Sequence, residues 1–428
     1  MNRSLWSNRN FLLLFSAQII SLLGSGVTTV GLAIFAYQLT GGASATVVIG
    51  NALFLRILAF LIFSQPAGVI ADRFSRKKIL IAADVLRFGL LALFPLITEI
   101  WQIYTLIFLI NAVTAFFTPT FEASIPKIVG EEQYVKALSY SRVAVNIEAF
   151  AAPALAGLLV VWLGVRWVFW FDAVSYLISA ALVLFAVMPF AARQILPLSL
   201  KTFASEIQTG TRILLREPSL RQAIILSFAE ATAGAAAIVA TVAFVREALG
   251  RGDTEYALVM AGLGLGSTIA AILLGRITGI YEQNINSKIA LHGRRHVWAR
   301  RSLVFGGVLL GVILLPGFLV PPLLIFAVLW FLNGAGQALI AISSSTLLAE
   351  HTDERERGKA YAAHFALTHA CWLVTYPAIG HAAAKFGTPA TITIAGAVCL
   401  IVTGFGYLMG RGEASEHHHA RSETVSGV

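Results

Sequence analysis

The sequence predicts an all-α membrane protein with twelve transmembrane helices, and its length, composition and charge distribution lead to this prediction. Of its 428 residues, 57% are hydrophobic and only 12% are charged, and the mean hydropathy is +0.79. A helix needs roughly 20 apolar residues to cross the ~30 Å hydrocarbon core of a bilayer. A chain of this length therefore holds about a dozen spans with short connectors and has no room for a soluble catalytic domain.

The apolar runs set the positions of the expected spans and divide the chain into two halves. The longest polar connector, 189–220, contains three prolines and separates six spans from six. Within it, Leu200 to Leu215 is expected to form an amphipathic helix on the membrane surface. The expected organisation is a six-helix bundle over 1–188, a linker over 189–220, a second six-helix bundle over 221–410 and a disordered tail over 411–428. The spans are expected at 11–39, 46–71, 79–98, 102–121, 135–161, 167–188, 221–247, 255–280, 302–320, 323–349, 358–383 and 389–409.

The basic residues predict the orientation of these spans. With the N-terminus placed in the cytoplasm, most of the 31 Lys and Arg residues fall in cytoplasmic segments. The opposite side carries only Arg166, Arg246, Arg251 and Lys385. This asymmetry indicates that both termini are cytoplasmic, in a bacterial-type inner membrane. The first apolar stretch is too long for a cleavable signal peptide.

Polar residues inside the expected spans are the candidates for a transport site, because each costs free energy in hydrocarbon. They are Glu148 in span 5, Glu230 in span 7, and His364, His369 and Cys371 in span 11. Carboxylate, imidazole and thiolate together suit a divalent transition metal. Imidazole also titrates near neutral pH, so metal and protons could compete for the same groups.

Helix geometry and local context leave alternatives for each of these residues. His364 and Cys371 are seven residues apart and share a helix face, whereas His369 lies about 140° from His364. We favour His369 as the ligand, then His364, then Cys371; the alternatives are interhelical hydrogen bonding for the histidines and core packing for Cys371. Glu230 is expected to be a proton or substrate carboxylate. Glu148 has the same candidate role, or belongs to a charge network with Arg142.

The turn between spans 2 and 3 carries the most specific motif, which runs from Gly68 through Asp72, Arg73 and Arg76 to Lys77. It resembles the G-x-x-x-D-R-x-G-R-R signature of the major facilitator superfamily, with Ser75 where that family usually has glycine. The resemblance implies an ionic latch that stabilises one access state. Glu122, near the end of span 4, is expected to pair with Arg73 or Arg76.

Other segments resemble the exporter branch of that superfamily that includes enterobactin and macrolide efflux proteins. They are Ala83 to Arg87, Phe116 to Pro126, Ala152 to Gly157 and Phe171 to Tyr176. Within them, Pro153 and Gly157 resemble the antiporter motif of span 5, and Asp84 with Arg87 is expected to form a structural ion pair. This resemblance implies proton-driven export.

Span 11 and the tail suggest the cargo by a second resemblance. The stretch Ala363 to Trp372, followed by Tyr376 and Pro377, and the three histidines His417 to His419 resemble the nickel-resistance exporters of the superfamily. The tail has only three consecutive histidines, and a solvated disordered end is the alternative.

Together these features predict a proton-coupled exporter of a divalent transition metal, nickel first and iron or cobalt next. An exporter of an amphipathic drug or siderophore is the main alternative, which several phenylalanines, including Phe117, Phe244 and Phe365, would suit. A membrane sensor on a transporter fold is a third interpretation. No enzyme motif is present, and we expect no resident cofactor, no nucleic-acid partner, a lipid bilayer as surroundings and a monomer.

Overall fold

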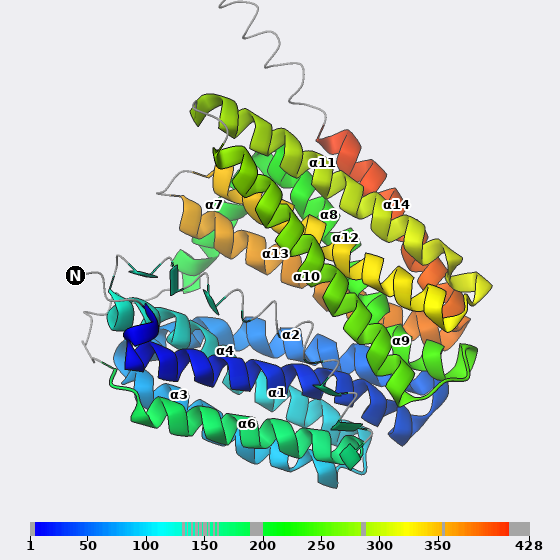
Figure 1. Ribbon diagram of the computed structural model, residues 1–428, viewed down its shortest axis with the longest axis horizontal. Coiled ribbons are helices and arrows are strands. Elements are labelled where there is room, and N and C mark those ends of the chain that lie inside the picture. Colours follow the sequence, from blue (N-terminus) through cyan, green and yellow to red (C-terminus); the bar gives the residue numbers. More distant parts are fainter. Residues whose placement is uncertain are drawn as a thin grey trace, which may run out of the picture.

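The computed structural model is helical throughout the part of the chain that it describes. It describes residues 5–130, 162–188, 200–283, 288–352 and 356–410, together with scattered positions between 133 and 160. The principal helices are α1 (Arg9–Thr40), α2 (Gly42–Arg73), α3 (Arg76–Ala92), α4 (Ile100–Val129), α6 (Val165–Phe185), α7 (Leu200–Arg216), α8 (Pro218–Ala235), α9 (Thr241–Ala243), α10 (Asp253–Gln283), α11 (Lys288–Leu314), α12 (Leu323–Glu350), α13 (Arg357–Phe386) and α14 (Thr388–Met409) (Figure 1).

Local sequence signals mark the residues at which these helices begin and end. The Asn8 side chain accepts hydrogen bonds from the first backbone N–H groups of α1, at 3.1 and 3.2 Å. Glu99 and Gln102 form a capping box at the start of α4, which satisfies N–H groups that have no partner inside the helix. Gly41 and Gly387 have φ values of 66° and 81°. This conformation favours glycine and allows single-residue turns between α1 and α2 and between α13 and α14.

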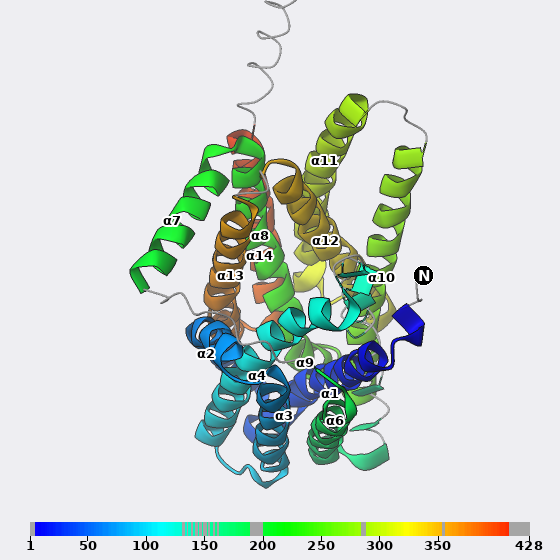
Figure 2. The ribbon, with the colours of Figure 1, turned by 90° about the vertical axis from the view of Figure 1, so that its left-hand side faces the viewer.

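The two halves of the chain repeat the same helix contacts. In the N-terminal half, α1 to α6, the pairs α2–α4, α1–α6, α3–α6 and α3–α4 pack together. In the C-terminal half, α8 to α14, the corresponding pairs are α10–α12, α8–α14, α11–α14 and α11–α12. Figure 1 shows the halves as two inclined groups of helices, and Figure 2 shows α7 at the left of the C-terminal half, where it packs against α13. The pseudo-symmetric bundle pair expected from the sequence is therefore confirmed.

Ten helices in the described residues are long and apolar enough to cross a membrane. The expected fifth span, 135–161, lies mostly outside the described residues. The expected eleventh span is present as the 30-residue helix α13, which three histidines make less apolar. A helix also occupies Leu200–Arg216, where the sequence predicts the linker helix.

One expected connection is wrong. The expected spans at 255–280 and 302–320 leave a connector over 281–301, which contains the basic residues Arg294 and Arg301. Instead, α10 continues to Gln283 and α11 begins at Lys288. The charged residues end the apolar run but not the helix, because Lys and Arg are good helix formers wherever their side chains reach water.

The helix that follows the linker is not a regular α-helix. It continues from α8 through two π-helical turns, Ala236–Ala240 and Phe244–Ala248, with α9 between them. Directly after the first of these turns, the hydroxyl of Thr241 in α9 accepts a 2.9 Å hydrogen bond from the indole N–H of Trp330. Such π turns widen a helix locally and often occur at functional sites.

The two halves touch each other mainly along α2 and α13. A Cβ added at Gly50 would lie 2.6 Å from the backbone oxygen of Tyr376, and one added at Gly380 would lie 2.5 Å from that of Thr46. The Thr46 hydroxyl also donates a 2.9 Å hydrogen bond to the Gly380 carbonyl oxygen. The two backbones are therefore in direct contact, which only small residues permit.

This contact lies toward one end of the molecule. We call the end with the turns at Gly41 and Gly387 the Gly41 end, and the opposite end, where α2 meets α3, the Arg73 end. At the Gly41 end, the Tyr37 hydroxyl also donates a 3.4 Å hydrogen bond to Glu247 of the other half. Figure 1 shows the halves converging there, where α9 contacts α1 and α2, and diverging toward the Arg73 end.

A matched pair of alanine substitutions tests the close contact. Gly50→Ala is expected to lower the free energy of unfolding by about 1–3 kcal/mol, because its methyl group must displace backbone. Gly89→Ala in α3 meets no atom within 4 Å and is expected to leave stability unchanged or raise it. Thermal unfolding of the purified variants in detergent measures both effects. Equal stability of the two variants would contradict the close packing of α2 on α13.

Candidate functional site

An aromatic cluster joins the two halves at the middle of α2 and α13. The Phe60 ring of α2 lies 5.8 Å from the ring of Phe365 and 6.5 Å from that of His369, both on α13. Phe365 and His369 stack on each other with centroids 3.7 Å apart. The Nδ1 atom of His369 lies 2.8 Å from the Phe365 carbonyl oxygen, which fixes the ring orientation.

Arg56 lies one helical turn before Phe60 on α2 and is an exposed side chain. Its guanidinium donates a 3.3 Å hydrogen bond to the Thr29 hydroxyl of α1. Its charge acts on Glu148 in the N-terminal half and on His369 and Tyr376 in the C-terminal half. Arg56 and Phe60 share one face of α2, and Phe60 contacts α13, so Arg56 lies close to the interface between the halves.

Glu148 lies against α1 and is half-buried. A Cβ added at Gly26 would lie 2.2 Å from its Oε1 atom, so the missing side chain of Gly26 provides the space for this carboxylate. The expected site residue Glu148 is therefore close to α1 and within reach of Arg56. The antiporter-like residues Pro153 and Gly157, and the alternative partner Arg142, lie outside the described residues.

Glu230 lies on α8 in a wall of small residues. Ala229, Ala231 and Ala233 are fully buried, whereas the Glu230 side chain is half-buried. One turn later, a Cβ at Gly234 would lie 2.2 Å from the indole of Trp372 on α13. Among the described residues, no cation forms an ion pair with Glu230. The expected role of Glu230 as a proton or substrate carboxylate stays a prediction.

The residues proposed as metal ligands are not gathered into a metal site. Among the described residues, no group of three or more His, Cys, Asp and Glu side chains could hold a metal ion. His369 packs against Phe60 and Phe365, and the buried Nε2 atom of His364 has no hydrogen-bond partner in the described part of the chain. Cys371 is half-buried, near enough to Glu230 to interact with its charge. The metal interpretation therefore receives no support from this part of the chain.

The expected latch lies at the Arg73 end. The helical backbone of Gly68, Asp72 and Arg73 belongs to α2, but their side chains are outside the described part of the structure. The guanidinium of Arg76 donates a hydrogen bond to the Ala123 carbonyl oxygen, and Lys77 donates one to that of Ala186, at 2.9 Å. Arg76 is therefore held against α4 beside Glu122, and their pairing stays a prediction.

A buried polar network crosses the inside of the N-terminal half. Asp84 and Arg87 are 0% and 3% exposed and form the expected ion pair, which is confirmed. The Ser179 hydroxyl donates a 2.7 Å hydrogen bond to Asp84. The guanidinium carbon of Arg87 lies 4.2 Å from the centre of the Phe117 ring and 4.3 Å from that of Tyr176.

Sequence reasoning missed one residue of this region and misplaced two others. Asp172 on α6 is fully buried, yet it was not among the expected site residues; a carboxylate within the apolar run of span 6 was the available signal. Phe117 and Phe244, which would suit an organic cargo if they faced a cavity, are buried in the bundle cores. Only Phe365 of the three lies at the interface between the halves.

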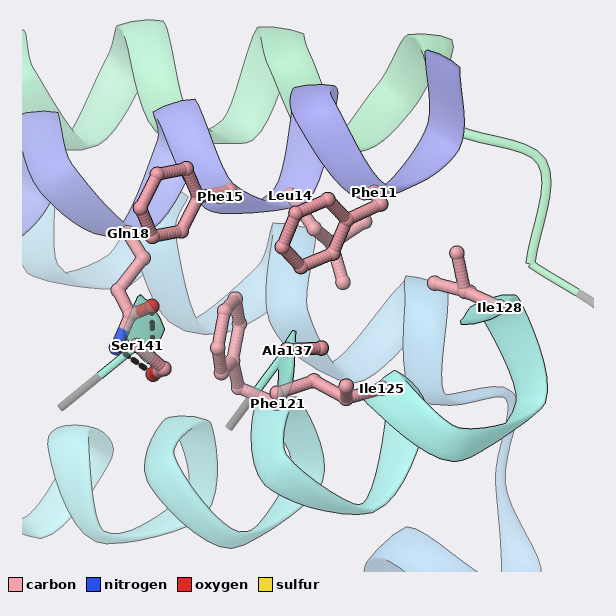
Figure 3. A pocket seen from close by; sticks show the side chains of 9 residues that line it. All are labelled: Phe11, Leu14, Phe15, Gln18, Phe121, Ile125, Ile128, Ala137 and Ser141. Atoms are coloured by element: carbon pink, nitrogen blue, oxygen red, sulfur yellow. Dashed lines mark hydrogen bonds between the residues drawn. The ribbon is translucent and has the colours of Figure 1, made fainter. Parts of the chain in front are cut away.

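A small cavity at the Arg73 end of the N-terminal half is apolar and stands apart from these groups. It is lined by Phe11, Leu14, Phe15, Gln18, Phe121, Ile125, Ile128, Ala137 and Ser141 (Figure 3). Gln18 and Ser141 bond each other across it at 2.6 and 2.8 Å. With its polar side chains paired, the cavity reflects the packing of Ala137 and Ser141 on α1 and α4.

The Asp84–Arg87 pair is expected to be structural, and a double-mutant cycle tests this. Asp84→Ala or Arg87→Ala alone should lower the free energy of unfolding by about 3–5 kcal/mol, because each leaves an uncompensated buried charge. The double variant should lose clearly less than the sum of the two. Additive losses in thermal or denaturant unfolding would show that the pair does not interact.

Comparison with known proteins places this architecture among transporters. The family model described as Major Facilitator Superfamily matches residues 14–293 and 232–426. Macrolide efflux protein A of Streptococcus pyogenes is 26% identical over 215 residues, which cover 49% of this chain and 52% of that protein. The match thus spans about half the length of that relative. An uncharacterized MFS-type transporter of Bacillus subtilis (strain 168), YfiS, is 22% identical over the full length of both chains.

Solved structures share the fold at low sequence identity. A bacterial homolog of the human lysosomal transporter Spinster, in an inward-facing and occupied conformation, has a TM-score of 0.74 and 14% identity, covering 96% of this chain and 98% of that chain. A mutant of the nucleoside transporter NupG has a TM-score of 0.71 and 13% identity, covering 94% and 100%. At such identities the likeness concerns the fold alone.

Proposed function

The chain belongs to the Major Facilitator Superfamily, a family of transporters and not of enzymes, and on this premise we propose that it exports an amphipathic organic compound in exchange for protons. It is a multi-pass membrane transporter of a small-molecule cargo. We thus propose an organic compound, and not a transition metal, as the cargo. No resident cofactor is needed, since the proton gradient supplies the driving force.

The aromatic cluster between the two halves carries this proposal. Phe60 belongs to one half, whereas Phe365 and His369 belong to the other. Stacked rings provide a large, weakly directional apolar surface, which suits a ring-containing organic molecule better than a hydrated ion. In transporters with duplicated halves, cargo binds at this interface near the middle of the membrane.

Charged groups beside the cluster supply the polar part of the site. Arg56 lies one helical turn before Phe60 on α2, and Glu148 lies against α1 in the same half. In the C-terminal half, Glu230 lies on α8, which packs against α13. A cargo with an apolar body and one charged group fits this arrangement, because it contacts the rings and one of the charges together. The relative from Streptococcus pyogenes is named a macrolide efflux protein, which supports a cargo of this kind.

We further propose that the Arg73 end faces the cytoplasm. The basic residues of the sequence concentrate on that side, as in other membrane proteins. The halves meet at the Gly41 end and diverge at the Arg73 end (Figure 1). In this orientation the structure represents a state that receives cargo from the cytoplasm, and export requires the contact at the Gly41 end to open.

Transport into inverted membrane vesicles tests the function. A vesicle that is acidic inside should accumulate a labelled macrolide. Phe60→Ala should raise the KM for the macrolide by about 2- to 10-fold, corresponding to ~0.5–1.5 kcal/mol of lost aromatic contact. Phe405→Ala, which removes an exposed ring of α14, is the matched control and should leave the KM unchanged.

The same vesicles distinguish the metal interpretation. Nickel, iron and cobalt should not accumulate above the level of vesicles that lack the protein. Gradient-dependent nickel accumulation that is abolished by His369→Ala, without macrolide transport, would contradict the organic-cargo proposal and restore the histidines as ligands.

A further inference from the structure

A polar pocket lies inside the N-terminal half, beside the interface between the halves. It is bordered by α1, α2, α3, α4 and α6 and is lined by aliphatic as well as polar residues. Most of its polar lining consists of hydroxyl and amide groups, with one cation and one carboxylate. The polar lining residues are Ser25, Thr28, Thr29, Arg56, Asn111, Thr114, Asp172 and Tyr176. Arg56, which borders the pocket, lies one helical turn from Phe60 at the interface between the halves.

Asp172 is the most buried charged group of this pocket, with 0% of its surface exposed. The Thr28 hydroxyl donates a 2.6 Å hydrogen bond to Oδ2, and the Ser175 hydroxyl donates a 3.1 Å bond to Oδ1. A Cβ at Gly24 would lie 2.2 Å from Oδ1. The glycine of α1 therefore provides the space in which this carboxyl group fits.

Asp172 differs from the other buried carboxylate of the N-terminal half. Asp84 is paired with Arg87, whereas no cation in the described part of the chain forms an ion pair with Asp172. A paired charge has a structural explanation. An unpaired carboxyl group inside a membrane protein marks a site for an ion or a proton.

The charged and titratable groups around Asp172 come from several helices. On α3, Arg87 acts on it electrostatically but already pairs with Asp84. On α6, the Tyr176 hydroxyl is hydrogen-bonded to that of Ser25 at 2.8 Å. On α2, Arg56 borders the pocket. The pocket-lining residues of α1 and α4 contribute hydroxyl, amide and aliphatic groups only.

We propose that Asp172 binds the coupling proton of the transport cycle and that the polar pocket is its hydrated route to the central space. This inference rests on the proposed proton-coupled export. The lining hydroxyl groups of α1 and α4 are suited to hydrogen-bond water. A proton arriving through water forms an O–H bond at a carboxyl oxygen of Asp172. That bond breaks when the proton returns to water on the other side.

Binding and release of this proton change the charge beside the interface by one unit. The protonated carboxyl group is neutral, whereas the carboxylate adds a negative charge between α1 and α6, in the half that also carries Arg56. Because α1 contacts both Asp172 through Thr28 and Arg56 through Thr29, it connects the proton site with the cargo site. Coupling then acts through adjacent residues of one helix.

Asp172→Asn tests the proposal, because it keeps the size of the side chain and removes its titration. In proteoliposomes, the variant should lose proton-driven macrolide accumulation by at least about 10-fold. It should retain exchange of labelled for unlabelled macrolide at equal pH on both sides, since exchange needs no net proton movement. Glu99→Gln, an exposed carboxylate at the start of α4, is the control and should accumulate macrolide like the wild type.

Proton binding is measured separately from transport by infrared difference spectroscopy of the purified protein. Lowering the pH should produce a carboxylic-acid C=O band in the wild type that Asp172→Asn lacks and Glu99→Gln retains. Thr28→Val, which removes one hydrogen bond to the carboxylate, should shift the midpoint of this band. The spectrum requires no cargo, so it remains informative if the macrolide is not transported and the proposed function fails.

Three results would overturn the proposal. The first is macrolide accumulation by Asp172→Asn at the wild-type level. The second is loss of exchange together with accumulation in a folded variant, which would place Asp172 in cargo binding or structure. The third is an infrared band unaffected by the substitution.

Discussion

The contact between α2 and α13 is the constraint on which the rest of the arrangement depends. At Gly50 and Gly380 the two backbones approach so closely that a methyl group would collide with a carbonyl oxygen. This contact closes the Gly41 end and sets the separation of the halves at mid-length. There, Phe60 meets Phe365 and His369 at ring distances of about 6 Å. The same helices therefore carry both the closed end and the aromatic site.

The positions of the charged side chains follow from the free-energy cost of burying polar groups in hydrocarbon. Asp84 and Arg87 neutralise each other inside the N-terminal half, and the ring faces of Phe117 and Tyr176 add to the stabilisation of the cation. Arg56, Glu148 and Glu230 instead lie at or near the interface between the halves. Asp172 belongs to neither group, since it is buried, hydrogen-bonded by hydroxyl groups and bordered by a polar pocket. Charges that lack a buried partner thus lie where we propose that cargo and protons pass.

The sequence was sufficient to predict the all-helical membrane fold. A segment that crosses hydrocarbon must satisfy its backbone hydrogen bonds internally, and a long apolar run does so as a helix. The duplication was predictable from the spacing of the apolar runs. The Asp84–Arg87 pair was predictable because its members lie three residues apart on one helix. The start of α11 at Lys288 was not predictable, because a charged stretch has the same composition in a loop as in a helix that projects into water.

The candidate site was harder to predict, because it depends on how each helix is rotated about its axis. The polar residues of span 11 were visible in the sequence, but only packing shows that His369 stacks on phenylalanine and that no third ligand joins it among the described residues. Asp172 was overlooked although a carboxylate in an apolar run is a strong signal. Its importance depends on Thr28 and Gly24, which are nearly 150 residues away and become neighbours only in the folded bundle.

Alternation between a state closed at the Gly41 end by the α2–α13 contact and a state closed at the Arg73 end is the central claim, and distances between spin labels test it most directly. One label pair, at Lys78 and Arg301, spans the halves at the Arg73 end; the other, at Trp101 and Phe318, spans them at the Gly41 end. All four positions are exposed, and Cys371 and Cys399 would first be replaced. On acidification with a macrolide present, the Lys78–Arg301 distance should shorten while the Trp101–Phe318 distance lengthens. Two unchanged distances, or two that change in the same direction, would contradict the account.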